Sequence, residues 1–180
     1  MELTLPLTKE KVKALKVGDI VSLTGYLYTC RDAGHKLIAE ALERGEKPPV
    51  DLQDQTIYYA GPCPARPGLA LGSNAPTTAA RMDPFVEMMF QQGVLAFLGK
   101  GTRADYVADL CKQYGGVSFL GIGVASALNT KHVKSAETVA YEDMGPESIK
   151  KLYLDHYRVI VGIDSNGNVL DKQEVPKYRR

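Results

Sequence analysis

The chain has few cysteines, no excess of either charge and no long apolar run, and each shortage excludes a class of protein. Its 180 residues include only Cys30, Cys63 and Cys111, which are widely spaced and form no Cys-x-x-Cys pair. That pattern argues against a disulfide framework and against a zinc or iron–sulfur site built from this chain alone. We therefore expect the chain by itself to hold no metal.

The distribution of charged and apolar residues narrows the possible partners. The net charge is +1, and the 22 basic and 21 acidic residues are interspersed, whereas nucleic-acid binding usually needs a clustered basic excess. No stretch approaches the roughly 20 apolar residues that span a bilayer, and the N-terminus lacks the pattern of a signal peptide. The sequence predicts a cytoplasmic protein with no nucleic-acid or membrane partner.

Short apolar runs alternate with amphipathic segments, which is typical of an α/β domain. The length suits one domain over residues 1–180, and we find no internal repeat or linker. At the C-terminal end of the chain, a hairpin is expected to pair residues 158–163 with residues 169–170. The predicted fold is a mixed central sheet with helices and a second small β layer. Strands are expected near 3–7, 19–28, 56–60, 94–98, 117–122 and 138–142, and helices near 9–15, 37–45, 77–92, 104–114 and 147–154.

Three cationic side chains stand in short turns that open or follow predicted helices. Arg31 lies between Thr29 and Lys36, Arg81 follows a pair of threonines, and Lys100 is flanked by glycines. Free backbone N–H groups and the helix dipole favour anions at such places. Three of them in one small domain suggest a site for a small acid with more than one negative charge.

The residue spacing around two of these cations leaves alternatives open. Thr77, Thr78 and Arg81 fall on one predicted helical turn, where they would form either an anion cradle or an N-cap beside a surface arginine. His35 lies one turn after Arg31, where it would either orient Arg31 or a ligand, or be a half-buried helix residue.

Two other motifs are better explained by a structural role than by ligand binding or catalysis. Gly121–Ser126 has the outline of a dinucleotide loop, but it ends in serine and is better interpreted as a tight turn. Cys30 is close to His35 in sequence, as a Cys–His nucleophile would require. A buried or turn cysteine is nevertheless the favoured interpretation.

Four motifs, in this order, resemble the class I fumarate hydratases. They are Arg-Asp-Ala-x-His-Lys at 31–36, Tyr-Tyr-Ala-Gly-Pro-x-Pro at 58–64, Thr-Thr-x-x-Arg-Met-Asp at 77–83 and Gly-Lys-Gly at 99–101. More narrowly, the chain resembles the β subunit of the two-subunit form of these enzymes and of L-tartrate dehydratase. The likeness covers most of the chain.

This resemblance implies a fold, an activity and a partner. The fold would be a swivelling β/β/α domain, equivalent to the C-terminal domain of the single-chain enzymes. The activity would be the reversible hydration of an unsaturated dicarboxylate, with fumarate to malate favoured over the tartrate reaction. A 4Fe-4S cluster would be held by a partner α subunit in a hetero-oligomer, and none by this chain.

The resemblance also implies roles for individual residues. Thr77 matches the proposed catalytic base, which an acidic residue of the α subunit would have to activate. The substrate carboxylates would be bound by Arg31, Arg81 and Lys100, and the residues with positioning roles would be Asp32, His35 and Thr78.

The chain departs from the family pattern beside Arg31. Cys30 stands where a glycine is usual and Gly34 where an alanine is usual, and both bear on which acid the site accepts. The chain begins at Met1 directly ahead of the domain, which favours a separate subunit. A rival hypothesis is a non-catalytic domain that binds dicarboxylates and has lost the chemistry.

Overall fold

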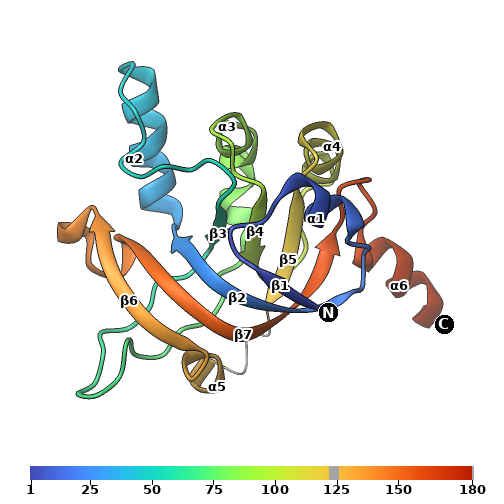
Figure 1. Ribbon diagram of the computed structural model, residues 1–180. Coiled ribbons are helices and arrows are strands. Elements are labelled where there is room, and N and C mark those ends of the chain that lie inside the picture. The colour runs from blue at the N-terminus through green and yellow to red at the C-terminus, as the bar shows by residue number, and fades with distance from the viewer. Residues whose placement is uncertain (122–125, 180) are drawn as a thin grey trace.

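The computed structural model describes residues 1–121 and 126–179, and its strands form one sheet that closes on itself (Figure 1). The strand order is β1-β2-β3-β4-β5-β7-β6, and β7 also pairs with β2, so that β2, β3, β4, β5 and β7 make a ring. Strands β1 to β5 pair in parallel, whereas β7 runs antiparallel to its neighbours. The strands are β1 Glu2–Thr4, β2 Ile20–Thr29, β3 Thr56–Tyr58, β4 Ala96–Gly99, β5 Val117–Gly121, β6 Val133–Ala140 and β7 Ile149–Ile163.

Helices follow most of the parallel strands, as the crossover between parallel neighbours requires. Figure 1 shows α2, α3 and α4 along one side of the sheet, and α6 with the C-terminus at the far end from α2. The helices are α1 Lys9–Ala14, α2 Asp32–Glu43, α3 Val86–Gln91, α4 Asp105–Tyr114, α5 Ser126–Thr130 and α6 Leu170–Tyr178, with 3-10 segments η1 Ala79–Phe85 and η3 Glu142–Glu147.

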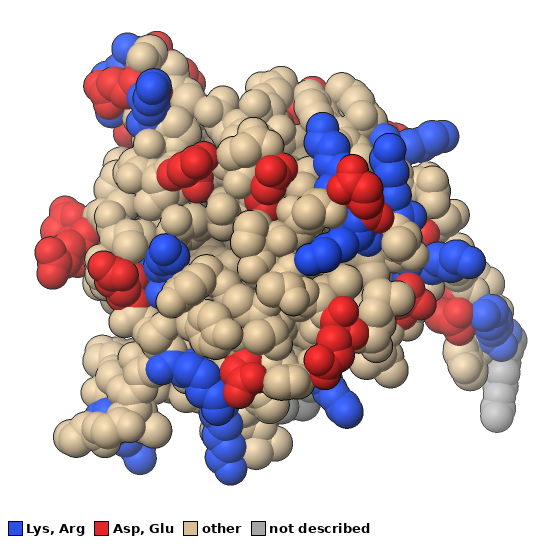
Figure 2. Space-filling model, in the orientation of Figure 1, with Lys and Arg blue, Asp and Glu red and all other residues tan. Residues whose placement is uncertain are grey.

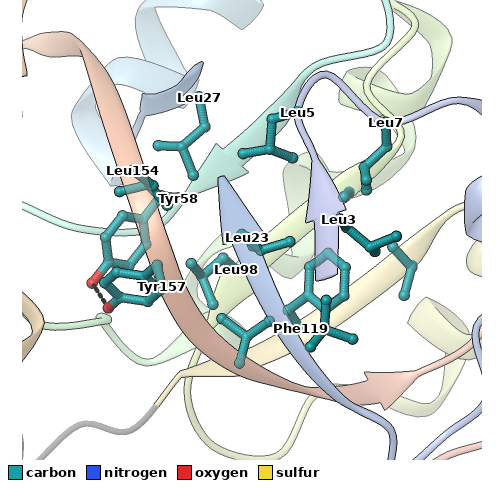
Figure 3. Packing of buried hydrophobic residues seen from close by; sticks show 14 of the residues in the cluster. Leu3, Leu5, Leu7, Leu23, Leu27, Tyr58, Leu98, Phe119, Leu154 and Tyr157 are labelled. Carbon is teal, nitrogen blue, oxygen red and sulfur yellow. Dashed lines mark hydrogen bonds between the residues drawn. The ribbon is translucent and has the colours of Figure 1, made fainter. Parts of the chain in front are cut away.

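Two apolar clusters lie on opposite faces of the ring because side chains alternate along each strand. Tyr58, Leu98 and Phe119 point into the ring, where Figure 3 shows them packed with leucines from β1 and β2. Their neighbours Ile57 and Phe97 point outward and pack against α2, α3 and α4. Burying each such side chain contributes about 1.5–3 kcal/mol, so both faces of the ring stabilise the fold.

The α/β class and most of the expected strands are confirmed, but the C-terminal third is not. A helix was expected at 147–154, and the chain instead forms the long strand β7 there. Leu152 and Leu154 are both buried inside the ring, which is the two-residue period of a strand. β7 pairs with β2, β5 and β6, so distant partners rather than local sequence decide its structure.

The expected closing hairpin and second β layer are also corrected. Ile163 and Val169 form one isolated bridge, after which the chain turns into α6 instead of a second strand. The strand predicted at 138–142 belongs to β6, which is an edge of the same sheet and not a separate layer. The Gly121–Ser126 motif falls largely on residues 122–125, which lie outside the described residues.

The surface charges are mixed, as the sequence predicted. Figure 2 shows basic and acidic side chains interspersed over the face in view. Among the described helices, none combines the length and the apolar character that crossing a bilayer demands.

Candidate active site

The cationic motifs follow the carboxyl ends of three neighbouring parallel strands. Cys30, just after β2, donates its N–H to the carbonyl of Tyr58 (3.0 Å), and Tyr59, just after β3, donates to the carbonyl of Leu98 (2.8 Å). Parallel strands bring their carboxyl ends to the same edge, which is where ligands bind in open parallel sheets. The segments that carry Arg31 and Lys100 therefore leave the sheet at one edge.

The threonine motif lies between these segments and extends the parallel sheet. Thr77 donates its N–H to the carbonyl of Tyr59 (2.6 Å) and accepts from the N–H of Lys100 (3.1 Å). Ala79 then donates to the carbonyl of Lys100 (2.9 Å), and Thr78 pairs with Lys100 as an isolated parallel bridge. The backbones of Thr77 and Lys100 are thus held together by main-chain bonds.

This arrangement corrects the expectation that Thr77, Thr78 and Arg81 share one helical turn. Thr77 is part of the extended stretch before η1, and the 3-10 helix begins only at Ala79. Thr78 occupies the N-cap position, but its side chain makes no capping hydrogen bond. The threonines are therefore placed by strand pairing and not by helix capping.

Arg81 reaches back to the segment that carries Arg31. Its Nε donates to Oδ1 of Asp32 (2.9 Å) and its Nη2 to Oδ2 (2.6 Å), a two-bond contact between η1 and the first residue of α2. The two side chains are 50% and 35% exposed, so the pair adds at most about 1 kcal/mol to stability. Its main effect is to fix the direction of the Arg81 guanidinium.

Arg31 lies at the N-cap of α2, beside the loop that follows β3. Its Nη2 is 3.1 Å from Oε1 of Glu147, the last residue of η3. Gly61 approaches from the loop so closely that an added Cβ would lie 2.3 Å from Nη1 of Arg31. Arg81 is thus bonded to the residue that follows Arg31, whereas Lys100 is joined to the threonine segment through its backbone.

His35 is fully buried, not half-buried, and it contacts Arg31, as the other of the two alternatives required. Its Nδ1–H donates to the backbone carbonyl of Arg31 (2.7 Å), and its ring packs against Tyr59 and Phe85 with centroids 5.5 Å away. Burial lowers the pKa of His35 to about 4, so the ring is neutral at physiological pH. The interaction supports the backbone of Arg31 from behind.

The structure contains a buried ion pair beneath the site that the sequence analysis did not predict. Nε of Arg103 donates to Oδ1 of Asp83 (2.7 Å), while Oδ2 accepts from the N–H of Ala104 at the start of α4 (2.8 Å). Nη2 of Arg103 also donates to the hydroxyl of Tyr59 (3.3 Å). Asp83 belongs to the Thr-Thr-x-x-Arg-Met-Asp motif, but nothing in the local pattern identifies Arg103 as its partner.

The cysteines do not form a reactive or metal-binding group. Burial raises the pKa of the Cys111 thiol to about 12 and that of Cys30 further, so neither forms a thiolate readily. This is evidence against the Cys–His nucleophile hypothesis for Cys30. Cys63 is exposed, and over residues 1–121 and 126–179 no three metal-ligating side chains lie together. The described residues of this chain therefore do not fit an iron–sulfur cluster.

Comparison with known proteins places these motifs in a family. The family model described as "Fumarase C-terminus" matches residues 1–174. The chain belongs to this family. This confirms the resemblance that the four sequence motifs indicated.

Relatives of two lengths are found within the family. The "Putative L(+)-tartrate dehydratase subunit beta" of Methanocaldococcus jannaschii is 38% identical over 168 residues, covering 90% of this chain and 86% of that protein. The aerobic class I fumarate hydratase of Salmonella typhimurium is 35% identical over 172 residues, covering 93% of this chain and 30% of that protein. The equivalent enzyme of Escherichia coli strain K12 is 38% identical over 150 residues, covering 82% and 27%. The chain therefore spans about a third or less of the fumarate hydratases that it matches.

Proposed function

We propose that this chain is the β subunit of a two-subunit hydro-lyase that adds water reversibly to fumarate to give malate. The observation that supports the proposal is that main-chain bonds join Thr77 to Lys100 at one edge of the sheet, while Arg81 is bonded to the residue after Arg31, in a member of the fumarase family. The active site would lie at the interface with an α subunit.

The cations suit a substrate with two carboxylates. An arginine–carboxylate pair at 4 Å is worth on the order of 4 kcal/mol at an effective dielectric constant near 20. Asp32 occupies the Nε and Nη2 edge of Arg81, so the substrate would meet Nη1. With Arg31 and Lys100 as the other binding groups, neutral compounds would be strongly disfavoured.

Thr77 is the proposed base of the dehydration direction. Its oxygen would take the proton from the carbon beside a carboxylate, and the C–H electron pair would form the new double bond as hydroxide leaves the neighbouring carbon. That hydroxide and the proton on Thr77 together make up the released water. Within the described residues the Thr77 hydroxyl has no hydrogen-bond partner, so the acidic group that activates it would come from the α subunit.

The 4Fe-4S cluster associated with the family is assigned in this proposal to the α subunit, because this chain's cysteines lie apart. A swivelling motion of the domain and a cytoplasmic location stay predictions from the resemblance and the composition. Tartrate is the second candidate substrate, since the relative of similar length bears a tartrate dehydratase name.

The test is anaerobic co-expression with an α-type chain, followed by assays on fumarate, L-tartrate and mesaconate. We expect turnover of one acid that needs both chains and is abolished by Thr77→Ala. If the cluster-loaded complex acts on none of these acids but binds them, the chain is a non-catalytic dicarboxylate-binding domain. Turnover by the pure, cluster-free chain would contradict the two-subunit proposal.

A further inference from the structure

We propose that Glu147 is a positioning residue for Arg31, holding its guanidinium in the direction in which it meets a substrate carboxylate. Glu147 comes from η3, more than 100 residues from Arg31 in the chain, and no sequence motif had linked the two. The inference rests on the proposed function, in which Arg31 binds substrate.

The guanidinium of Arg31 lies beside two segments. Nη2 contacts Oε1 of Glu147 at 3.1 Å, and the two side chains are 22% and 26% exposed. At Gly61, in the loop after β3, an added Cβ would be 2.3 Å from Nη1 of Arg31 and 3.1 Å from the carbonyl oxygen of Pro146. The glycine loop and the η3 segment thus form a slot around the guanidinium.

The segment that presents Glu147 is itself held firmly. The carbonyl of Gly145 accepts hydrogen bonds from the N–H of Ser148 (3.1 Å), from its hydroxyl (2.6 Å) and from Nζ of Lys150 (2.9 Å). Lys150 also donates its N–H to Oγ1 of Thr29 (3.0 Å), two residues before Arg31. Gly145 has φ 56° and ψ −116°, a conformation that a side chain would strain. Glu147 is therefore presented by a segment tied to the strand that carries Arg31.

The contact leaves part of the hydrogen-bonding capacity of Arg31 unused. Arg81 meets Asp32 through two bonds, whereas Arg31 meets Glu147 through Nη2 alone. Nε of Arg31 and Oε2 of Glu147 are buried and have no partner among the described residues. A buried polar atom without a partner is costly, so a pair that served stability alone would be expected to use both edges. The one-sided contact orients the guanidinium while keeping Nη1 out of the pair.

The experiment uses the assembled, cluster-loaded complex and the acid that it turns over best. KM, kcat and the thermal unfolding midpoint are measured for Glu147→Ala, Glu147→Gln and the control Glu142→Ala, an exposed residue of the same segment. We expect Glu147→Ala to raise KM about tenfold or more, because the ion pair that orients the binding arginine is lost, with kcat and the midpoint nearly unchanged. Glu147→Gln keeps an acceptor oxygen and should restore most of the loss.

Gly61→Ala perturbs the same guanidinium at Nη1 and is the second variant to measure if Glu147→Ala folds poorly. It should raise KM in the same way, and its effect should not add to that of Glu147→Ala, because both act through Arg31. A fall in KM for Glu147→Ala would overturn the proposal by showing that Glu147 competes with substrate. An unchanged KM with a lowered midpoint would overturn it by showing a purely structural pair.

Arg31→Lys in the same complex distinguishes failure of the proposed function from failure of the role proposed for Glu147. If that substitution leaves KM unchanged while the complex is active, Arg31 does not bind substrate and the proposed role of Arg31 fails. If Arg31→Lys raises KM but Glu147→Ala does not, only the role of Glu147 fails.

Discussion

His35 illustrates how burial decides what a residue in this site can do. Its place one turn after Arg31 was compatible with orienting Arg31 or a ligand, or with being a half-buried helix residue. The structure encloses the ring between Tyr59 and Phe85 and uses its Nδ1–H to support the Arg31 carbonyl. A neutral ring in that place can hold the backbone but is poorly suited to proton transfer with a substrate.

The depressed pKa of His35 predicts a pH-dependent stability. In the unfolded chain the imidazole takes up a proton near pH 6.5, whereas in the folded chain it does so only near pH 4. The unfolded state thus binds more protons between these values, so folding stability falls as pH drops from about 6.5 towards 4, by on the order of 3 kcal/mol in full. Urea unfolding of the isolated chain at pH 7.5 and pH 5 measures this loss.

The matched variant is His35→Asn, whose amide N–H replaces the Nδ1 donor without a titrating ring. We expect it to be less stable than wild type at pH 7.5 but to lose clearly less stability on acidification. His156→Asn, on the exposed face, should retain the wild-type loss between these pH values apart from the small contribution of its own ion pairs. If wild type and His35→Asn lose the same stability between pH 7.5 and pH 5, groups other than His35 cause the loss.

At the scale of elements, the buried pair of Asp83 and Arg103 joins η1 to the start of α4. The two side chains are 5% and 3% exposed, and together they satisfy the hydroxyl of Tyr59 and the N–H of Ala104. Because η1 carries Arg81, this pair also determines where that cation lies. Its role is to anchor the site, not to act in it.

Removing one partner should be costly because the other charge stays buried. We expect Asp83→Ala to lower the free energy of unfolding by about 3–5 kcal/mol, measured by chemical denaturation. Asp105→Ala is the control, since Asp105 pairs with Lys172 on the surface at 2.8 Å and should cost less than about 1 kcal/mol. A loss of similar size in both variants would mean that the Asp83 pair is accessible to water.

The ring of strands is joined internally by two tyrosines. The hydroxyls of Tyr58 on β3 and Tyr157 on β7 are 2.9 Å apart inside the apolar cluster, as Figure 3 shows. We expect Tyr157→Phe to lose about 1–3 kcal/mol, because it leaves the Tyr58 hydroxyl buried and unpaired. Adding Tyr58→Phe should cost less than the two single losses combined, which a double-mutant cycle by urea unfolding would measure.

The elements that the sequence predicted well are those whose pattern is local. The strand around Phe97 is a continuous apolar run, and α2 has its apolar face at helical spacing and stops near Gly45. The prediction for β7 was wrong because the first half of this strand carries Lys150 and Lys151 beside Leu152, a mixture that also suits a short helix. Its structure depends on pairing with β2, which lies more than 100 residues earlier.

The same distinction applies to the site. The cationic turns of the sequence indicated Arg31, Arg81 and Lys100, and the resemblance supplied the proposed role of Thr77. Strand topology explains why Thr77 and Lys100 lie side by side. Composition and spacing alone would not have chosen Thr77, whose position follows from two main-chain bonds to other segments. Long-range partners such as Glu147 and Arg103 become visible only once the fold brings them to the cations.

At the scale of the whole molecule, the chain has two apolar cores and a complete sheet ring, yet its site contains only part of the groups that the proposed reaction needs. The cations and Thr77 stand at an edge, and the described residues offer neither a base for Thr77 nor a group of cluster ligands. The matched fumarate hydratases are about three times as long as the part that this chain covers. In the proposed function, the missing chemistry comes from the α subunit.

This division of labour predicts that the chain's own cysteines are dispensable for the cluster. In the assembled complex, combining Cys30→Ala, Cys63→Ser and Cys111→Ala should leave the iron content and the visible absorption of the cluster unchanged. Some stability would be lost, because Cys30 and Cys111 are buried and their truncation opens small cavities. Iron loss in the exposed Cys63→Ser variant alone, with unchanged thermal stability, would place a cluster ligand in this chain. That result would contradict the assignment of the whole cluster to the α subunit, because a folding defect could not account for it.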